Sequence, residues 1–251
     1  MQKSKPTVLI TGACGGIGKA LVRAFSADNY FIVATDRVRP PDNGLIDEFI
    51  QAELEKTVTD EVYAAEIFSK IQDKIQGDGL NALINNAAWQ KIKAFQKLTR
   101  DDWSNTLKVN LLAPVFWSQA FMSELTKASG AIVNLSSIHA TQTKPGFSAY
   151  ATSKAALSAL TRNMAVEISG VRINAIEPAA VSTEMLEAGF NVYEGARREL
   201  DSLHPLGRIA TPDEIAKVAV FLCSKASTFI HGSCISVSGG IQSCLLDPGN
   251  K

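Results

Sequence analysis

The sequence predicts an α/β fold in which one parallel sheet is covered by helices on both faces. Short, nearly continuous apolar runs recur along the chain, as is typical of strands that are buried on both sides. Longer segments with helical periodicity separate these runs, so strand and helix alternate from end to end. The chain of 251 residues is 46% hydrophobic and 20% charged, which is enough to bury the core of such a fold.

This alternation predicts the elements in order. Strands are expected at residues 7–11, 30–35, 48–54, 80–85, 131–135, 171–176 and 235–237. Helices are expected at residues 16–27, 60–76, 100–127, 149–169 and 212–224. Residues 40–44, Pro-Pro-Asp-Asn-Gly, indicate a tight loop, so no full helix is expected between the second and third strands.

A single domain spanning residues 1–251 is expected, because no internal repeat or low-complexity linker divides the chain. Residues 182–208 form the longest irregular region. A connection of this length is uncommon in a compact domain unless it has a function. We therefore expect it to form a substrate lid.

Charge and hydropathy exclude several classes of partner. The 25 Lys and Arg balance the 25 Asp and Glu, so nucleic acid and anionic membrane surfaces are not expected to bind. The apolar stretches are far shorter than the ~18 residues of a membrane span. Pro6 and the glycines from Gly12 interrupt the first apolar segment before it could act as a signal peptide. The four cysteines lack metal-ligand spacing, so we expect a cytoplasmic protein with reduced thiols and no metal.

A glycine-rich turn follows the first predicted strand. Gly12, Gly15, Gly16 and Gly18 lead from this strand into the first predicted helix. Glycines permit positive φ and let the backbone approach a pyrophosphate, whose charge is favoured by the free N–H groups at a helix start. Any tight strand-to-helix connection can use glycine, so the turn alone does not establish a dinucleotide site.

An acidic residue supplies the second half of this pattern. Asp36 closes the second apolar run, twenty positions after Gly16, where its carboxylate can bond the hydroxyl groups of an adenosine ribose. The same carboxylate would repel a 2′-phosphate, so NAD is favoured over NADP as the cofactor. Arg37 follows directly and could hold a 2′-phosphate, so NADP stays the alternative.

Tyr150 and Lys154 lie four residues apart in a predicted helix, which puts the phenol and the ammonium on one face. A nearby ammonium is expected to lower the tyrosine pKa from about 10 toward the working pH, as a general acid and base requires. The same spacing is common on solvated helices. Ser137, however, follows the fifth predicted strand, at the edge where parallel sheets bind ligands, and Asn110 lies in the helical segment before it.

Together these motifs closely resemble the short-chain dehydrogenase/reductase family. The resemblance is to the branch whose members consist of one doubly wound Rossmann-like domain of three α/β/α layers, which holds both the cofactor site and the catalytic residues. The resemblance covers almost the whole chain. Residues 11–18 match the T-G-x-x-x-G-x-G turn, and residues 150–154 match Y-x-x-x-K. Residues 85–88 match N-N-A-G except that Ala88 replaces the glycine. The resemblance implies an NAD(P)-dependent oxidoreductase that interconverts a secondary alcohol and a ketone.

The resemblance also implies a catalytic tetrad of Asn110, Ser137, Tyr150 and Lys154. Tyr150 would exchange a proton with the reacting oxygen, and Ser137 would hydrogen-bond the same oxygen. Lys154 would lower the Tyr150 pKa and bond the nicotinamide ribose. Asn110 would hold a water that links Lys154 to solvent.

Further residues are expected to bind the cofactor by the same resemblance. Ala179 replaces the glycine of the family's P-G-x-x-x-T segment, and a glutamate, Glu53, stands where an aspartate usually meets the adenine. The predicted cofactor contacts are Gly12, Cys14, Gly15, Gly16, Ile17, Gly18, Asp36, Arg37, Glu53, Leu54, Asn86, Ala87, Ala88, Tyr150, Lys154, Pro178, Val181 and Thr183.

The substrate is expected to be a small, moderately polar, hydroxylated molecule. Candidate substrate contacts are Ser137, His139, Trp89, Phe147, Met185 and Tyr193, with Gln90, Thr141, Leu186 and Phe190 nearby in the chain. His139 could bond a substrate hydroxyl, although a loop histidine without a catalytic task is the plainer interpretation. Arg197 and Arg198 could bind an anion, or lie on a solvated helix face.

Two interpretations of function and one of assembly remain open from the sequence. A non-catalytic NAD-binding sensor or scaffold would keep the glycine turn and Asp36, but has little need of the tetrad. An epimerase or dehydratase is disfavoured by the glycine spacing and by the lack of a separate substrate domain. By analogy with the family, we expect a homotetramer or homodimer.

Overall fold

The computed structural model describes residues 5–40, 44–75, 77, 79–187 and 195–245; of Met185 and Glu187 it describes the backbone alone. Within these residues the strands are β1 (Thr7–Thr11), β2 (Phe31–Asp36), β3 (Glu48–Gln51), β4 (Ala82–Asn85), β5 (Ala131–Leu135), β6 (Arg172–Pro178) and β7 (Cys234–Val237). The strands form one parallel sheet in the order β3-β2-β1-β4-β5-β6-β7. The prediction of a doubly wound α/β fold is confirmed.

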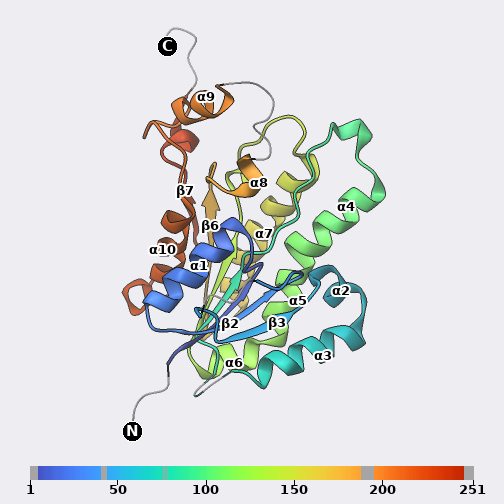
Figure 1. The fold of residues 1–251 in the computed structure, drawn as a ribbon, viewed down its shortest axis with the longest axis vertical. Helices are drawn as coiled ribbons and strands as arrows, with labels where there is room; N and C mark the ends of the chain where they lie inside the picture. Colours follow the sequence, from blue (N-terminus) through green and yellow to red (C-terminus); the bar gives the residue numbers. More distant parts are fainter. Residues whose placement is uncertain (1–4, 41–43, 76, 78, 188–194, 246–251) are drawn as a thin grey trace.

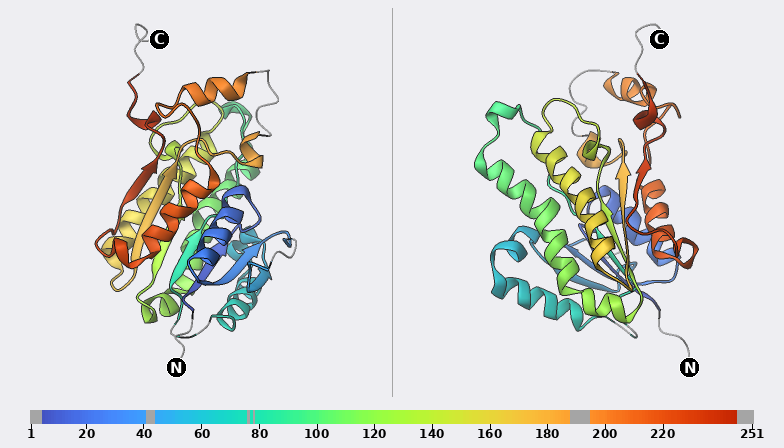
Figure 2. Two further views of the ribbon diagram at one scale, coloured as in Figure 1. Left: turned by 60° about the vertical axis from the view of Figure 1, so that its left-hand side comes forward. Right: turned by 180° about the vertical axis from the view of Figure 1, so that it is seen from behind.

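Helices cover both faces of the sheet (Figure 1). They are α1 (Gly16–Ala27), α2 (Leu54–Thr59), α3 (Glu61–Gln72), α4 (Arg100–Leu107), α5 (Ala113–Ala120), α6 (Met122–Lys127), α7 (Ser148–Glu167), α8 (Glu184–Glu187), α9 (Ala196–Ser202) and α10 (Pro212–Cys223). Helices α1 and α10 pack together on one face, and the view from behind in Figure 2 shows α4, α5 and α7 on the other.

Two apolar cores explain why the strands are almost continuously apolar. Alternate residues of each strand point to opposite faces, so Val8 and Ile10 of β1 pack toward α1 and α10, whereas Leu9 packs toward α3, α5 and α6. The second core includes Trp117 and Phe121, which are both fully buried. Each strand therefore needs hydrophobic residues on both sides.

Two predicted elements differ from the structure. The strand expected at residues 48–54 ends at Gln51, and Leu54 begins helix α2. The helix expected at residues 100–127 is interrupted by a π-helical segment, Lys108–Leu112, and by a turn at Phe121. Pro114 follows the π-helical segment and has no N–H to donate to the carbonyl of Asn110, so a regular α-helical ladder cannot continue there.

The described part of residues 182–208, the predicted lid region, is more regular than the sequence predicts, because it contains α8 and α9. The loop expected at residues 40–44 lies partly outside the described residues. Its described neighbours, 37–40 and 44–47, contain no helix, in agreement with the expected short crossover. In the part of the chain that the structure describes, no helix has both the length and the apolar character to cross a membrane.

Candidate active site

A cavity of about 400 Å³ lies at the carboxyl ends of the parallel strands. Residues that follow six of the strands, β1 to β6, line it, which is where open parallel sheets bind their ligands. Its wall runs from Gly12 after β1, past Asp36 at the end of β2, to Pro178 at the end of β6. The cavity therefore joins the predicted cofactor site to the predicted catalytic residues.

The glycine turn requires glycine for steric reasons. Gly12 has a φ of +66°, and a Cβ atom there would lie 2.7 Å from the Cα of Ala87. A Cβ at Gly18 would collide with the carbonyl oxygen of Gly12, and one at Gly16 would lie 2.7 Å from Cγ2 of Thr183. Side chains at these positions would fill the cradle between the turn and the ends of β4 and β6.

The start of α1 offers free hydrogen-bond donors to the cavity. Gly15 is the N-cap residue and has no side chain to cap the helix, and the first turn carries no acidic residue. Gly16, Ile17 and Gly18 of this turn all line the cavity. The backbone N–H groups of a first helical turn lack helical partners, so this turn is suited to bind a phosphate.

Asp36 ties the glycine turn to the end of β2. One carboxylate oxygen, Oδ2, accepts a hydrogen bond from the N–H of Cys14 at 2.9 Å, and Oδ1 accepts one from the N–H of Val38 at 3.3 Å. The neighbouring Arg37 places its guanidinium carbon 6.0 Å from the ring centroid of Trp89, across the cavity wall. Asp36, Arg37 and Cys14 all line the cavity, as predicted for cofactor contacts.

Asn86 holds the turn from the other side. Its Nδ2 donates to the carbonyl oxygens of Thr11 and Gly12, both at 2.9 Å. The hydroxyl of Thr11 accepts from the N–H groups of Asn86 and Ala87, at 3.1 and 3.2 Å. These bonds tie the loop after β4, where residues 85–88 lie, to the glycine turn after β1. They can form because β4 lies next to β1 in the sheet.

The remaining predicted cofactor residues divide into two groups. Leu54, Ala88, Pro178 and Thr183 line the cavity. Glu53 instead pairs its carboxylate with Lys56 at 2.6 Å, and Val181 is buried in a bridge to Ala210. The structure does not place these last two side chains on the cavity wall.

Lys154 is buried beside the cavity. Its Nζ donates to the carbonyl oxygen of Leu135 at 2.6 Å and lies 5.6 Å from the ring centroid of Tyr150. Burial lowers the pKa of Lys154 to about 7. The ammonium that the sequence places near Tyr150 thus loses its proton far more easily than an exposed lysine.

The predicted lowering of the Tyr150 pKa is wrong for this structure. Burial raises the pKa of Tyr150 to about 12, and a hydrogen bond with Ser137 acts in the opposite direction without reversing it. The cause is desolvation, which disfavours the charged form of both Tyr150 and Lys154. Tyr150 is therefore protonated here, as a proton donor to a carbonyl oxygen must be.

Asn110 lies behind the cavity, within the π-helical segment, and is fully buried. Its Oδ1 accepts from the N–H of Trp89 at 2.7 Å, and its Nδ2 donates to the Trp89 carbonyl and to Ser153 Oγ, both at 2.9 Å. Ser153 in turn donates to the carbonyl of Tyr150 at 2.7 Å. Asn110 thereby links the loop after β4 to the start of α7.

The aromatic rings of His139 and Phe147 flank Tyr150. The rings of His139 and Phe147 stack with centroids 4.4 Å apart, and His139 meets Tyr150 edge-on at 5.8 Å. Burial, followed by the charge of Lys144, lowers the pKa of His139 to about 4, so the imidazole is neutral at neutral pH. Its Nδ1 lies 2.9 Å from Thr143 Oγ1. Two predicted substrate residues, His139 and Phe147, thus lie together beside Tyr150.

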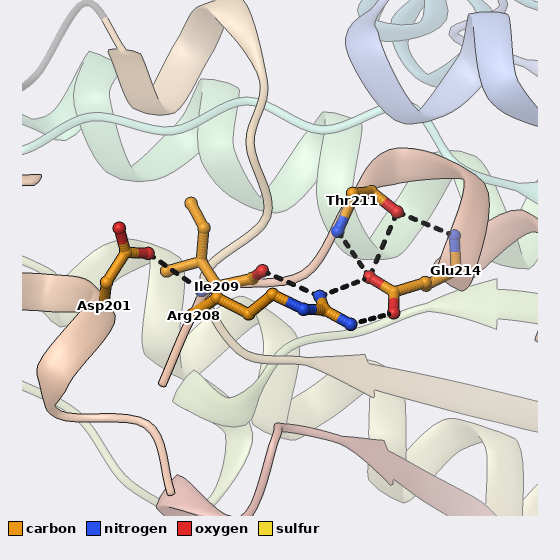
Figure 3. A network of polar contacts seen from close by, with 5 residues as sticks. All are labelled: Asp201, Arg208, Ile209, Thr211 and Glu214. Carbon is orange, nitrogen blue, oxygen red and sulfur yellow. Dashed lines mark hydrogen bonds and ion pairs between the residues drawn. The ribbon is translucent and has the colours of Figure 1, made fainter. Parts of the chain in front are cut away.

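The lid region is anchored at its carboxyl end. Figure 3 shows Arg208 forming two bonds to the carboxylate of Glu214, at 2.7 and 2.9 Å, while Asp201 accepts from the N–H of Ile209. Thr211 and Glu214 form a capping box at the start of α10. Two predicted lid contacts with substrate, Phe190 and Tyr193, lie outside the described residues, as does the side chain of Met185.

Sequence reasoning missed several residues of the cavity wall. These are Val38, Ala52, Glu55, Val109, Leu135 and Ser136. Ala52 directly follows β3, so the correct end of that strand would have found it, whereas Leu135 ends β5, whose bounds the sequence predicts correctly. Glu55 and Val109 reach the cavity from helices, and no signal in the sequence marks them. In the described residues no group of three metal-ligating side chains occurs.

Known proteins resemble this chain over almost its whole length. A family model described as enoyl-(acyl carrier protein) reductase matches residues 12–242. Protein FixR of Bradyrhizobium diazoefficiens is 35% identical over 255 residues, which cover 96% of this chain and 88% of FixR. The 3-oxoacyl-(acyl-carrier-protein) reductase FabG of Thermotoga maritima is 32% identical over 249 residues, which cover 96% of this chain and 99% of FabG.

Solved structures share the whole fold. Ligand-free aldohexose dehydrogenase of Thermoplasma acidophilum superimposes with a TM-score of 0.89 and 25% identity, over 97% of both chains. ElxO with NADP bound gives a TM-score of 0.85 and 30% identity over 96% of this chain and 100% of ElxO. A 4-hydroxyisoleucine dehydrogenase complexed with NADH gives 0.85 and 26%, over 96% of this chain and 100% of that one.

Proposed function

The chain belongs to the short-chain dehydrogenase/reductase family, and we propose that it interconverts a secondary alcohol and a ketone on a small hydroxylated molecule. The observation that carries this proposal is that the half-buried Tyr150 and the buried Lys154 line one cavity wall, continuous with the glycine cradle. A module that only bound a dinucleotide would have no need of a phenol beside a buried lysine at the far end of the cavity.

The residues of the cradle fit a nicotinamide dinucleotide. The uncapped first turn of α1 suits the pyrophosphate, and Asp36, fixed by two backbone N–H groups, suits an adenosine ribose. Relatives of known structure hold NADP in one case and NADH in another, which supports a nicotinamide cofactor without choosing between the two. The carboxylate of Asp36 on the cavity wall favours NAD over NADP in this chain.

When bound, the cofactor accepts or donates the hydride. The chain's own part is to hold the reacting oxygen and to move its proton. Tyr150, protonated through burial, donates a proton to a ketone oxygen, and in the reverse direction accepts the proton of the alcohol. Ser137 hydrogen-bonds Tyr150 and is positioned to orient the same oxygen, with its Oγ also accepting from the N–H of His139 at 3.1 Å.

Lys154 acts on Tyr150 through its charge. Near its pKa of about 7 the amine gains a proton readily, and the ammonium then stabilises the phenolate that forms when Tyr150 gives up its proton. The carbonyl of Leu135 fixes the lysine in this position. The neutral imidazole of His139 and the ring of Phe147 would contact the substrate next to the reacting carbon.

The proposed reaction is tested by the absorbance of reduced nicotinamide. NAD or NADP is offered with polyols, sugars, hydroxyacyl esters and steroids, and the purified protein is added. We expect turnover of a polar hydroxylated compound, with kcat/KM higher for NAD than for NADP. Turnover confined to flat apolar steroids would contradict the substrate class. Cofactor binding without turnover of any compound would favour the sensor or scaffold.

Assembly and location are further parts of the proposal. By analogy with the family we propose a homotetramer or homodimer in the cytoplasm, with no partner beyond the small-molecule substrate. Small residues of α7, including Ala155 and Ala159, would allow close packing between copies. Light scattering at micromolar concentration tests the assembly, and a monomer would contradict it.

A further inference from the structure

One contact crosses the glycine end of the cavity, and the proton transfer at Tyr150 does not use it. The guanidinium carbon of Arg37, after β2, lies 6.0 Å from the ring centroid of Trp89, after β4, and both residues line the cavity. Strands β2 and β4 lie on either side of β1 in the sheet. The contact therefore spans the end of β1, where the glycine turn begins. A cation within about 6 Å of an aromatic ring is attracted by the face of that ring.

The backbone on the Arg37 side of this contact is fixed. The carbonyl oxygen of Arg37 accepts from Nε2 of Gln51, in β3, at 2.9 Å. The next residue, Val38, donates its N–H to Asp36 Oδ1, and its carbonyl oxygen accepts from Cys14 Sγ, both at 3.3 Å. These bonds leave the side chain as the part of Arg37 that can change direction.

The backbone on the Trp89 side is fixed by Asn110, which binds both polar groups of its peptide unit. Asn110 Oδ1 accepts from the N–H of Trp89 at 2.7 Å, and Asn110 Nδ2 donates to the carbonyl oxygen of Trp89 at 2.9 Å. Asn110 is itself fully buried. The Trp89 ring is half-buried, whereas Arg37 is exposed. When the contact opens, Arg37 is therefore the side chain that moves.

Arg37 is the cation that a 2′-phosphate would meet beside Asp36. Among the described residues that line the cavity, the only other basic side chain is Lys154. Lys154 lies at the opposite end, where its Nζ donates to the carbonyl oxygen of Leu135. A guanidinium binds phosphate well, because its planar N–H groups match the phosphate oxygens. The direction of the Arg37 side chain therefore decides whether a 2′-phosphate finds a cation.

We propose that Trp89 is a specificity-determining residue, which holds Arg37 across the cavity and thereby disfavours NADP. This rests on the proposed function, because it concerns the nicotinamide cofactor of the same site. A 2′-phosphate must draw Arg37 away from the ring, so the apparent affinity for NADP falls with the fraction of molecules in which Arg37 is free. A cation–π contact at an exposed site lowers this affinity by about two- to fivefold. NAD has no 2′-phosphate, so its affinity does not depend on the contact.

Calorimetric titration of the whole protein with NADPH and with NADH, in the absence of substrate, tests the effect of Trp89. In Trp89→Leu the Kd for NADPH should fall by about threefold while the Kd for NADH stays unchanged. Trp89→Phe keeps an aromatic ring, so its Kd for NADPH should lie between those of the wild type and Trp89→Leu. Trp103→Leu is the matched control, because Trp103 lies in α4 and does not line the cavity. An unchanged Kd for NADPH in Trp89→Leu, or a parallel change for both cofactors, would overturn the proposal.

Arg37→Ala, alone and combined with Trp89→Leu, tests whether Trp89 acts through Arg37. The loss of Arg37 should raise the Kd for NADPH by about threefold more in the Trp89→Leu background than in the wild type. Additive effects would overturn the proposal, because Trp89 would then act on the cofactor directly. A protein that binds both cofactors but turns over no alcohol would refute the proposed reaction and leave this test intact. A protein that binds neither cofactor would overturn both.

Discussion

The two ends of the cavity are built in different ways. At the glycine turn, the backbone forms the site: N–H groups of α1 line it, and Asp36 and Asn86 are used to hold backbone atoms. At the end of β5, side chains form the site, and Tyr150 and Lys154 owe their properties to burial. The glycine end of the cavity depends on the absence of side chains, whereas the other end depends on the surroundings of the Tyr150 and Lys154 side chains.

This difference predicts different responses to substitution. A backbone-built site should fail when an added atom moves the chain, with loss of cofactor affinity. A site built from buried side chains should fail through its protonation states, with effects that depend on pH.

Gly18→Ala should damage the cofactor end most. The added Cβ would collide with the carbonyl oxygen of Gly12, so the turn must shift. Overpacking of this kind costs about 1–3 kcal/mol, so the Kd for NADH should rise by up to about 100-fold. Fluorescence titration with NADH measures this Kd. Gly44→Ala is the control: its φ of +65° strains the variant and should lower its stability, but a Cβ there meets nothing within 4 Å and Gly44 does not line the cavity, so the Kd should match the wild-type value.

Lys154 should make stability depend on pH. Its pKa falls from 10.5 in the unfolded chain to about 7 in the fold, so between these values the unfolded chain binds more protons. The cost of burying Lys154 is therefore greatest below pH 7 and shrinks as the pH rises.

From pH 7 to pH 9 this one group should add about 2 kcal/mol to the free energy of unfolding. Urea unfolding of the wild-type protein and of Lys154→Met at both pH values measures the difference. The rise with pH should be smaller in Lys154→Met by that amount. Equal pH dependence in the two proteins would show that burial does not shift the lysine.

Asp36→Ala should weaken cofactor selection without stopping the reaction. The variant loses a carboxylate that is fixed on the cavity wall by the N–H groups of Cys14 and Val38. The repulsion between this carboxylate and a 2′-phosphate also disappears. The ratio of kcat/KM with NAD to kcat/KM with NADP should therefore fall by about tenfold. Steady-state kinetics with both cofactors measures it, and an unchanged ratio would exclude Asp36 as the selecting residue.

Thr211→Ala should have the smallest effect, because it touches neither end of the cavity. Thr211 caps α10 by accepting from the N–H of Glu214 at 3.4 Å, and loss of such a cap costs about 1 kcal/mol. Thermal unfolding should show a lower Tm, while kcat and the cofactor KM stay at wild-type values. A fall in kcat beyond about twofold would mean that the anchor of the lid region takes part in turnover.

The sequence predicts the backbone-built end well, because its signals are local. Glycine spacing and Asp36 after an apolar run specify a strand, a turn and a helix, and β1 and α1 occur at the predicted residues. At the end of the cavity that side chains form, the sequence predicts which residues make up the site but not the shifts of their pKa values. Tyr150 and Lys154 stand together as expected, yet their pKa values follow from desolvation in the folded protein, which no local sequence pattern reveals.

The interrupted helix before β5 shows the same limit. Its periodicity continues through residues 100–127, but Pro114 forces a π-helical turn that carries Asn110 to the backbone of Trp89. Glu177 of β6 is a further case, since nothing in the sequence indicates that Ser158 of α7 donates a hydrogen bond to its carboxylate. Such contacts depend on how helix α7 packs on the sheet.

Turnover and NADH binding, measured together in Tyr150→Phe, test most directly the claim that one end of the cavity binds and the other reacts. The variant keeps the ring and removes the proton that the reacting oxygen needs. We predict that kcat falls by about 1,000-fold or more while the Kd for NADH stays within about twofold of wild type. Retained turnover in Tyr150→Phe, or a parallel loss of NADH binding, would contradict this division.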